Sequence, residues 1–268
     1  MNKESSYNLI VVFHASVLTK KLNLVEYFLK KHLEIFKSYE NNYNFPVFID
    51  ACKYSSPAII KKIFLAYKDK FLVLTNYGHI AIRILFDRKM FKLSNWLITR
   101  ETDNIKNLIR YGDYIIFRHI AVQGNLKELK NIVNYCPDEY NKMVSSNNFS
   151  SFNSAVLSNK TNIINHFIKT NTYKVKDMLL ANKCDAFISC VLTGNLSLIK
   201  FFMNLMINKE NTLFKAQGYR SILKAIEFNR VDIIKYFLSI EPTLFEKSIT
   251  IITKNNNRFS MLFNAKVN

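Results

Sequence analysis

The chain has 268 residues and a hydrophobic fraction of 49%, which describes a folded globular protein with room for one large domain or two ordinary ones. Its five glycines and four prolines argue against a β-sandwich and against a Gly-rich phosphate-binding loop. The formal charge of +18 is spread evenly, because residues 1–134 carry 21 basic and 11 acidic side chains and residues 135–268 carry 17 and 9. This spread favours a solvated, lysine-rich surface over a dedicated nucleic-acid tail.

A segment that recurs seven times along the chain is the main signal of fold. Its copies begin at Phe13, Phe48, Ala81, Phe117, Phe152, Phe187 and Ile222. Their spacings are 35, 33, 36, 35, 35 and 35 residues, and a fixed period of this length predicts a solenoid of repeated helical units. The repeat cores are predicted near residues 13–29, 48–64, 81–97, 117–133, 152–168, 187–203 and 222–238.

The first half of each core predicts a short helix. In the first copy, Phe13 is followed three residues later by Ser16 and then by Val17, a spacing that places all three on one helical face. Small residues recur at the second of these positions: Ser16, Ala51, Ala155, Cys190 and Ala225. Small side chains there allow a neighbouring helix to approach closely.

The second half of each core predicts a tight turn and an amphipathic helix. The turn falls at Gly124-Asn125 and Gly194-Asn195 in two copies, and glycine and asparagine suit the left-handed conformation that ends a helix. Apolar pairs follow at a spacing of three to four residues, which is the 3.6-residue period of a one-sided helix. Each repeat is therefore predicted to be a helix, a turn and an antiparallel helix.

With these features the chain resembles the ankyrin-repeat family. Phe13-His14 and Ser16-Val17 occupy the places of that family's Leu-His and Ala-Ala, and Gly124-Asn125-Leu126 and Gly194-Asn195-Leu196 match its Gly-His-Leu. The resemblance covers about residues 10 to 240. It implies an all-α fold, an α-solenoid of about seven ankyrin-like helix-turn-helix repeats within a single domain over residues 1–268.

The resemblance weakens in the segments between repeats. The Thr-Pro that opens an ankyrin helix is absent, and so is the Gly-Ala-Asp signal of the projecting β-hairpin. We therefore expect strand content near zero, with the hairpins shortened or replaced by loops. Residues 242–268 do not continue the register and are predicted to form a C-terminal cap.

Residues that could support catalysis or metal binding are not spaced for either. The five histidines contain no His-x-x-x-His pair, and the four cysteines contain no Cys-x-x-Cys pair. The resemblance implies that His14 holds a turn by hydrogen bonds, whereas His119 is predicted to be exposed on a first helix. The cysteines indicate buried, reduced thiols. We therefore predict no enzyme activity, no cofactor and no metal.

The expected location is the cytoplasm. No apolar run approaches the ~18 residues of a membrane span. The segment Leu9–Leu18 is apolar and follows Lys3, but His14 interrupts it and it belongs to the first repeat, so we do not interpret it as a signal peptide.

Lysines that recur at one repeat position, here called the lysine column, could indicate a nucleic-acid-binding surface. Lys61, Lys130, Lys200 and Lys235 share one position of the second helix. Glu26, Ser94 and Asn165 interrupt this column, so we interpret it as a solvated helix surface.

The first helices supply the predicted binding surface, because the resemblance implies that ankyrin-like stacks bind partners on the concave face those helices form. The outward residues predicted to bind are Asp50, Lys53, Arg83, His119, Lys224 and Glu227. The predicted function is a non-enzymatic scaffold or adaptor for a protein partner. The amino-acid composition indicates an AT-rich coding sequence. Together with the ankyrin-like repeats, this resembles host-directed proteins of large DNA viruses and intracellular bacteria, which work in the host cytoplasm or nucleus.

Two other classes stay open. A nucleic-acid-binding solenoid predicts a contiguous basic stripe and a steep salt dependence of binding. A divergent enzyme predicts a pocket in which polar side chains from several repeats converge.

Overall fold

All regular structure in the described chain is helical. The computed structural model describes residues 3–42, 45–206, 210–217 and 219–243, and it contains no strand within them, which confirms the all-α prediction. In chain order the α-helices are α1 (Lys3–Leu18), α2 (Leu22–Lys31), α3 (Leu33–Asn42), α4 (Pro46–Tyr54), α5 (Pro57–Ala66), α6 (Lys70–Asp87), α7 (Phe91–Ile98), α8 (Ile105–Gln123), α9 (Leu126–Tyr135), α10 (Tyr140–Leu157), α11 (Thr161–Thr170), α12 (Val175–Thr193), α13 (Leu196–Leu205), α14 (Glu210–Lys215), α15 (Arg220–Glu227) and α16 (Val231–Ile240). Three 3₁₀ segments join them: η1 (Thr99–Asn104), η2 (Pro137–Glu139) and η3 (Thr172–Lys174). Of the predicted C-terminal cap, residues 244–268 lie outside the described part.

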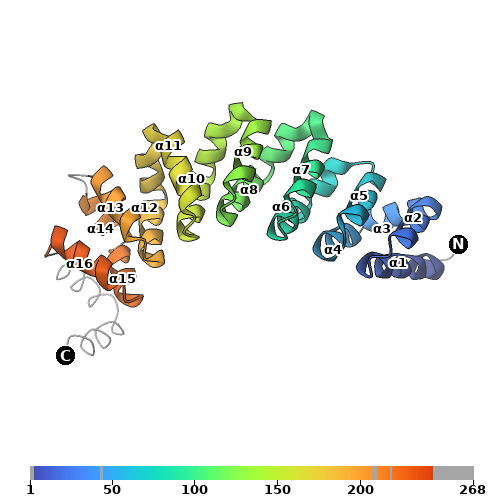
Figure 1. The fold of residues 1–268 in the computed structure, drawn as a ribbon, viewed down its shortest axis with the longest axis horizontal. Coiled ribbons are helices and arrows are strands. Elements are labelled where there is room, and N and C mark those ends of the chain that lie inside the picture. Colours follow the sequence, from blue (N-terminus) through green and yellow to red (C-terminus); the bar gives the residue numbers. More distant parts are fainter. Residues whose placement is uncertain (1–2, 43–44, 207–209, 218, 244–268) are drawn as a thin grey trace. The chain divides into compact units, whose positions relative to one another are not determined.

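The helices form two compact units. Unit 1 contains residues 1–120 and 127–143, and unit 2 contains residues 121–126 and 144–268. In unit 1, α1 packs against α4 and α4 against α6, while α2 packs against α5 in the row drawn above them (Figure 1). In unit 2, α12 packs against α13 and α15. The prediction of one domain over the whole chain stays a prediction.

Each predicted core folds as a helix, a tight turn and a second helix. The first and second helices are α1 and α2, α4 and α5, the second half of α6 and α7, the second half of α8 and α9, α10 and α11, α12 and α13, and α15 and α16. Most turns place one residue in the left-handed region, as predicted: Lys20, Lys89, Gly124, Asn159, Gly194 and Asn229. The turn between α4 and α5 instead uses extended residues before Pro57, which suits the first position of a helix.

The two turn glycines are required for a second reason besides their conformation. Gly124 has φ +78°, and a Cβ atom there would lie 2.7 Å from Cδ of Lys160. Gly194 has φ +76°, and its Cβ would lie 3.0 Å from Nη1 of Arg230. In both cases a long basic side chain from the next repeat, 36 residues later, lies over the turn and would have to move to admit a side chain beneath it.

The segments between repeats are helical, which was not predicted. Instead of loops, α3, α14 and the first halves of α6, α8, α10 and α12 form a third helical segment after each of the first six repeat cores. A break then precedes the next first helix. Its last residue is left-handed, with φ of 60–66°, at Phe45, His79, Tyr114, Phe149, Cys184 and Tyr219. Non-glycine residues in this conformation cost about 1–2 kcal/mol each, and burial of five of these six side chains offsets that cost.

Phenylalanine fills the core of both units. Phe48 stacks on Phe64 in unit 1 with ring centroids 5.9 Å apart, and Phe187 stacks on Phe237 in unit 2 at the same distance. The small residues between them, such as Ala51, are fully buried. The large aromatic rings and the small buried residues together therefore set the separation of neighbouring helices.

We expect overpacking at the small positions to destabilise unit 2. Ala155 and Ala225 have no exposed surface, so replacing either by leucine should lower the free energy of unfolding by about 1–3 kcal/mol. Urea denaturation followed by circular dichroism measures this. Asn165→Leu, at an exposed position of α11, is the control and should leave the midpoint nearly unchanged. Unchanged midpoints for both alanine variants would show that these positions do not separate helices.

Candidate protein-binding surfaces

The predicted binding residues all lie on first helices. We call them the first-helix surface: Asp50 and Lys53 on α4, Arg83 on α6 and His119 on α8 in unit 1, and Lys224 and Glu227 on α15 in unit 2. They were expected to point outward into solvent. The structure instead shows that most of them are half-buried and paired with other side chains.

Asp50 bridges two repeats. Its carboxylate lies 3.0 Å from Nε2 of His14 on α1 and accepts a hydrogen bond of 3.1 Å from Nζ of Lys53. The side chains of His14 and Asp50 are 27% and 26% exposed. The role implied for His14 is therefore corrected, because its ring pairs with an acid of the next first helix rather than with the turn.

His119 also joins neighbouring first helices and is less exposed than predicted. Its Nε2 lies 2.9 Å from Oδ1 of Asp87, and its side chain is 14% exposed. Burial lowers the pKa of His119, against the opposing effect of the Asp87 carboxylate. Arg83 is half-buried beside it. In this part of the surface, the polar side chains are therefore held by their neighbours and are not free charges.

The part of the surface in unit 2 consists of one ion pair on α15. Nζ of Lys224 lies 2.6 Å from Oε2 of Glu227 and 5.5 Å from the centre of the Phe228 ring. Such exposed pairs stabilise a fold by less than about 1 kcal/mol. Their effect is to orient the two side chains, leaving Glu227 as the more exposed of the two.

Grooves between consecutive second helices form further candidate surfaces that were not predicted. In unit 1, a groove of about 420 Å³ lies between α2 and α5 and another of about 540 Å³ between α5 and α7. In unit 2, a groove of about 430 Å³ lies between α11 and α13. Their floors include residues that the sequence pattern assigns to the core, such as Leu29, Ile164 and Leu198, so no pattern within one helix could have indicated the grooves.

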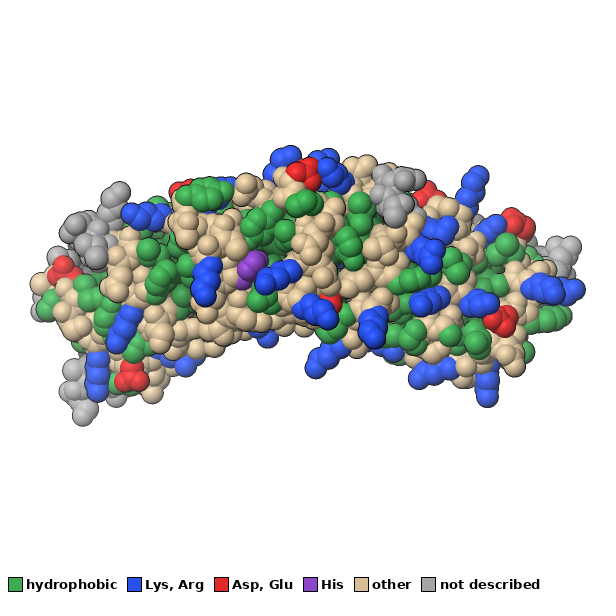
Figure 2. Space-filling view, turned by 45° about the horizontal axis from the view of Figure 1, so that its top comes forward, with side chains coloured by type: hydrophobic (Ala, Val, Ile, Leu, Met, Phe, Trp, Pro, Cys, Tyr) green, Lys and Arg blue, Asp and Glu red, His purple; other side chains and the backbone are tan. Residues whose placement is uncertain are grey.

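The lysine column is exposed over most of its length. Lys130, Lys200 and Lys235 are exposed, as predicted for a solvated surface, but Lys61 is half-buried with its Nζ 4.9 Å from the centre of the Trp96 ring. Figure 2 shows lysine and arginine side chains scattered among hydrophobic ones on its face, with few acidic groups between them.

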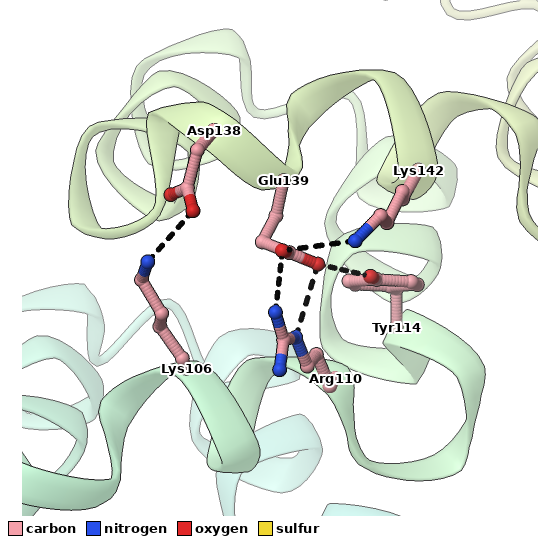
Figure 3. Close-up of polar contacts among 6 residues, drawn as sticks. All are labelled: Lys106, Arg110, Tyr114, Asp138, Glu139 and Lys142. Atoms are coloured by element: carbon pink, nitrogen blue, oxygen red, sulfur yellow. Dashed lines mark hydrogen bonds and ion pairs between the residues drawn. The ribbon is translucent and has the colours of Figure 1, made fainter.

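A buried carboxylate in unit 1 links η2 to α8 (Figure 3). Glu139 is 3% exposed and accepts two hydrogen bonds from Arg110, of 3.0 and 2.6 Å, and one of 2.6 Å from the Tyr114 hydroxyl. The Arg110 guanidinium is the main cause that lowers the pKa of Glu139 to about 2. Lys106 and Asp138 form a second, exposed pair at 2.7 Å. Because both oxygens of Glu139 are occupied by partners, this cluster orients two segments and offers no free acid.

A second buried carboxylate caps a first helix. Glu40, at the end of α3, is fully buried and accepts hydrogen bonds from the backbone N–H groups of Val47 and Phe48, at 3.0 and 3.2 Å. The Tyr67 hydroxyl donates a third, short hydrogen bond. These groups favour the charged form, but burial outweighs them and raises the pKa of Glu40 to about 7. Nothing in the local sequence distinguishes Glu40 or Glu139 from an exposed acid.

The cysteines are buried, as predicted, and burial raises the pKa of each thiol. Within the described part of the chain, no group of three or more His, Cys, Asp or Glu side chains is placed to hold a metal ion. None of the helices described there combines the length and apolarity that crossing a membrane requires.

Comparison of the chain with protein-family models, curated proteins and solved structures finds no match. What the protein binds must therefore be inferred from the chemistry of its own surfaces.

Proposed function

We propose that this chain is a non-enzymatic protein-binding scaffold or adaptor, an α-solenoid of ankyrin-like repeats that holds a protein partner on its first-helix surface. As a host-directed factor of viral or bacterial origin, it would act in the cytoplasm or nucleus of the host cell.

The observation that supports this proposal is a contrast between two adjacent repeat positions. When the repeats are aligned on their turns, the third repeat shifts by one residue from its predicted start at Ala81. One position then holds acidic, basic, polar and apolar residues: Ala15, Asp50, Ile84, His119, Ser154, Ser189 and Lys224. The next position is buried in every repeat: Ser16, Ala51, Leu85, Ile120, Ala155, Cys190 and Ala225. Varied side chains next to positions that are always buried are what one-sided recognition of a protein requires.

The pairing of the surface residues favours binding. Side chains held in place by neighbours, such as Asp50 between His14 and Lys53, have already lost part of their rotational freedom. The entropy lost on contact with a partner, about 0.5–1.5 kcal/mol for each mobile side chain, is therefore smaller.

Removal of the first-helix surface should abolish partner recovery. We expect a variant with Asp50, Lys53, Arg83, His119, Lys224 and Glu227 all changed to alanine to keep its circular dichroism spectrum. Affinity capture from host-cell lysate, with partners identified by mass spectrometry, should recover the partner with the wild type but at least tenfold less with the variant.

The matched control changes the outer lysines Lys130, Lys200 and Lys235 to alanine, and it should recover the partner as the wild type does. Equal recovery by the wild type and the first-helix variant would contradict the proposal. Binding of an oligonucleotide that weakens steeply with salt and with loss of the outer lysines would favour the nucleic-acid alternative.

A further inference from the structure

We propose that the groove between α5 and α7 is a second binding site, which takes an acidic peptide segment with apolar side chains. It is independent of the first-helix surface, because it lies between second helices. We call it the lysine groove. Its basic residues are Lys61, Lys89 and Lys92, and its apolar floor includes Met90, Phe91 and Leu93.

The three lysines of the groove have no acidic partner among the side chains that the structure describes. The adjacent Lys62, by contrast, lies 2.8 Å from Glu26. Lys61 instead contacts the face of Trp96. Three unpaired ammonium groups around one hollow create a positive potential that attracts carboxylates.

The start of α7 adds to this potential. Its N-cap residue is Met90, whose side chain makes no capping hydrogen bond, although the Leu93 N–H donates a 3.0 Å hydrogen bond to the Met90 carbonyl. In α13 the corresponding residue is Asn195, which accepts a 3.0 Å hydrogen bond from the N–H of Leu198. The positive end of α7 therefore acts together with the three ammonium groups.

Lys89 lies in the turn that precedes α7. Its φ is 58°, the left-handed conformation that Lys20 adopts in the first turn and Gly124 and Gly194 adopt in later ones. At this position its side chain lines the groove.

The apolar floor favours a peptide over a nucleic acid. Met90 and Phe91 are half-buried and Leu93 is 4% exposed, in a groove of about 540 Å³, so an apolar side chain can be buried between the lysines. Nucleic-acid sites of this kind use open aromatic faces for base stacking. The nearby Trp96 ring is covered by Lys61 and by Arg100, whose Cζ lies 4.8 Å from the ring centre.

This groove has more basic lining residues than the two other second-helix grooves. The groove between α2 and α5 is lined by Lys30, Lys62 and Glu26, and Lys62 is paired with Glu26. The groove between α11 and α13 in unit 2 has Lys169 as its one basic lining residue, and its other polar lining residues are Thr161, Asn165, Asn195 and Ser197. It therefore supplies a less basic groove for comparison within the same chain.

The test measures binding of a fluorescein-labelled peptide of about twelve residues, made of alternating glutamate and leucine pairs, by anisotropy. We compare it with the same peptide carrying glutamine for glutamate, and with single-stranded DNA of equal length. Because Trp96 is the sole tryptophan and contacts Lys61, its emission should also shift when the acidic peptide binds to the wild type.

We expect the acidic peptide to bind the wild type at least tenfold more tightly than the glutamine peptide does. The variant K61E/K89E/K92E should weaken binding at least tenfold, K61R/K89R/K92R should retain it, and the control K169E/K200E/K235E, with the same net charge change, should retain it. The first-helix alanine variant should also retain it, so the outcome is separate from that of the proposed function.

Equal binding by K61E/K89E/K92E and K169E/K200E/K235E would overturn the proposal, because it would show that net charge alone attracts the peptide. Equal affinity for the glutamine peptide would also overturn it. Tighter binding of the DNA than of the acidic peptide, lost in K61E/K89E/K92E, would replace it with a nucleic-acid site.

Discussion

Replacing Glu40 by glutamine is expected to remove a pH dependence from the stability of unit 1. The native pKa of about 7 lies above the usual 4.5, so the folded chain holds a proton on Glu40 more tightly than the unfolded chain does. The free energy of unfolding therefore falls as pH rises from 4.5 to 7, and the loss is complete above that range. At 1.36 kcal/mol for each pKa unit, the loss amounts to about 3 kcal/mol.

The measurement is urea denaturation at pH 5 and at pH 8, followed by the emission of Trp96, which lies in unit 1. The stability of Glu40→Gln relative to the wild type should rise by about 2–3 kcal/mol between these two values. The comparison with the wild type is necessary because His79, whose pKa burial lowers to about 4, contributes the opposite slope in both proteins.

Glu34 provides the control for Glu40, because it lies on the same helix with its side chain 86% exposed. Glu34→Gln should show no change relative to the wild type between pH 5 and pH 8. A difference between Glu40→Gln and the wild type that stays constant over this range would mean that Glu40 is ionised throughout.

Replacing Gly194 by valine is expected to destabilise unit 2 by about 2–3 kcal/mol. A β-branched residue is strained at φ +76°. Its Cβ would also displace the Arg230 guanidinium, which donates a hydrogen bond to the Leu192 carbonyl. Urea denaturation followed by circular dichroism measures the loss.

An equivalent turn of the same chain shows which residue pair could replace Gly194 and Arg230. At the equivalent turn one repeat earlier, the left-handed residue is Asn159. Asn195, 36 positions after Asn159, donates a 2.9 Å hydrogen bond to the Asn159 side chain. Gly194→Asn alone should cost about 1 kcal/mol, because Arg230 must move. Adding Arg230→Asn should recover most of that loss. No recovery in the double variant would show that the conformation of residue 194, and not the contact with residue 230, sets the loss.

These pairs of turn residues show what could be predicted from the sequence and what could not. Glycine lies beneath a long basic side chain at Gly124 and Lys160 and at Gly194 and Arg230, whereas asparagine meets asparagine at Asn159. The residues themselves were visible at a spacing of 36. That they touch became apparent only in the structure, because the period alone does not say which positions of adjacent repeats meet.

The candidate sites divide in the same way. The six residues of the first-helix surface could be chosen from the sequence, because each lies beside a residue that helical spacing assigns to the core. Their partners could not, since His14 and Asp50 or Asp87 and His119 come from different repeats. The lysine groove could not be predicted from the sequence either. A groove depends on the distance between two helices and not on the residue pattern of either helix.

The sequence by itself determined the 35-residue period, the paired helices, the left-handed turns and the buried small positions. These follow from helical periodicity and from the conformational preferences of glycine and asparagine, which act over a few residues. Only the tertiary structure decided the third helical segment, the left-handed conformation of buried residues such as Tyr114, and the raised pKa of Glu40. Each of these depends on burial against a neighbouring repeat, which outweighs the local preference of the residue and has no signature in the surrounding sequence.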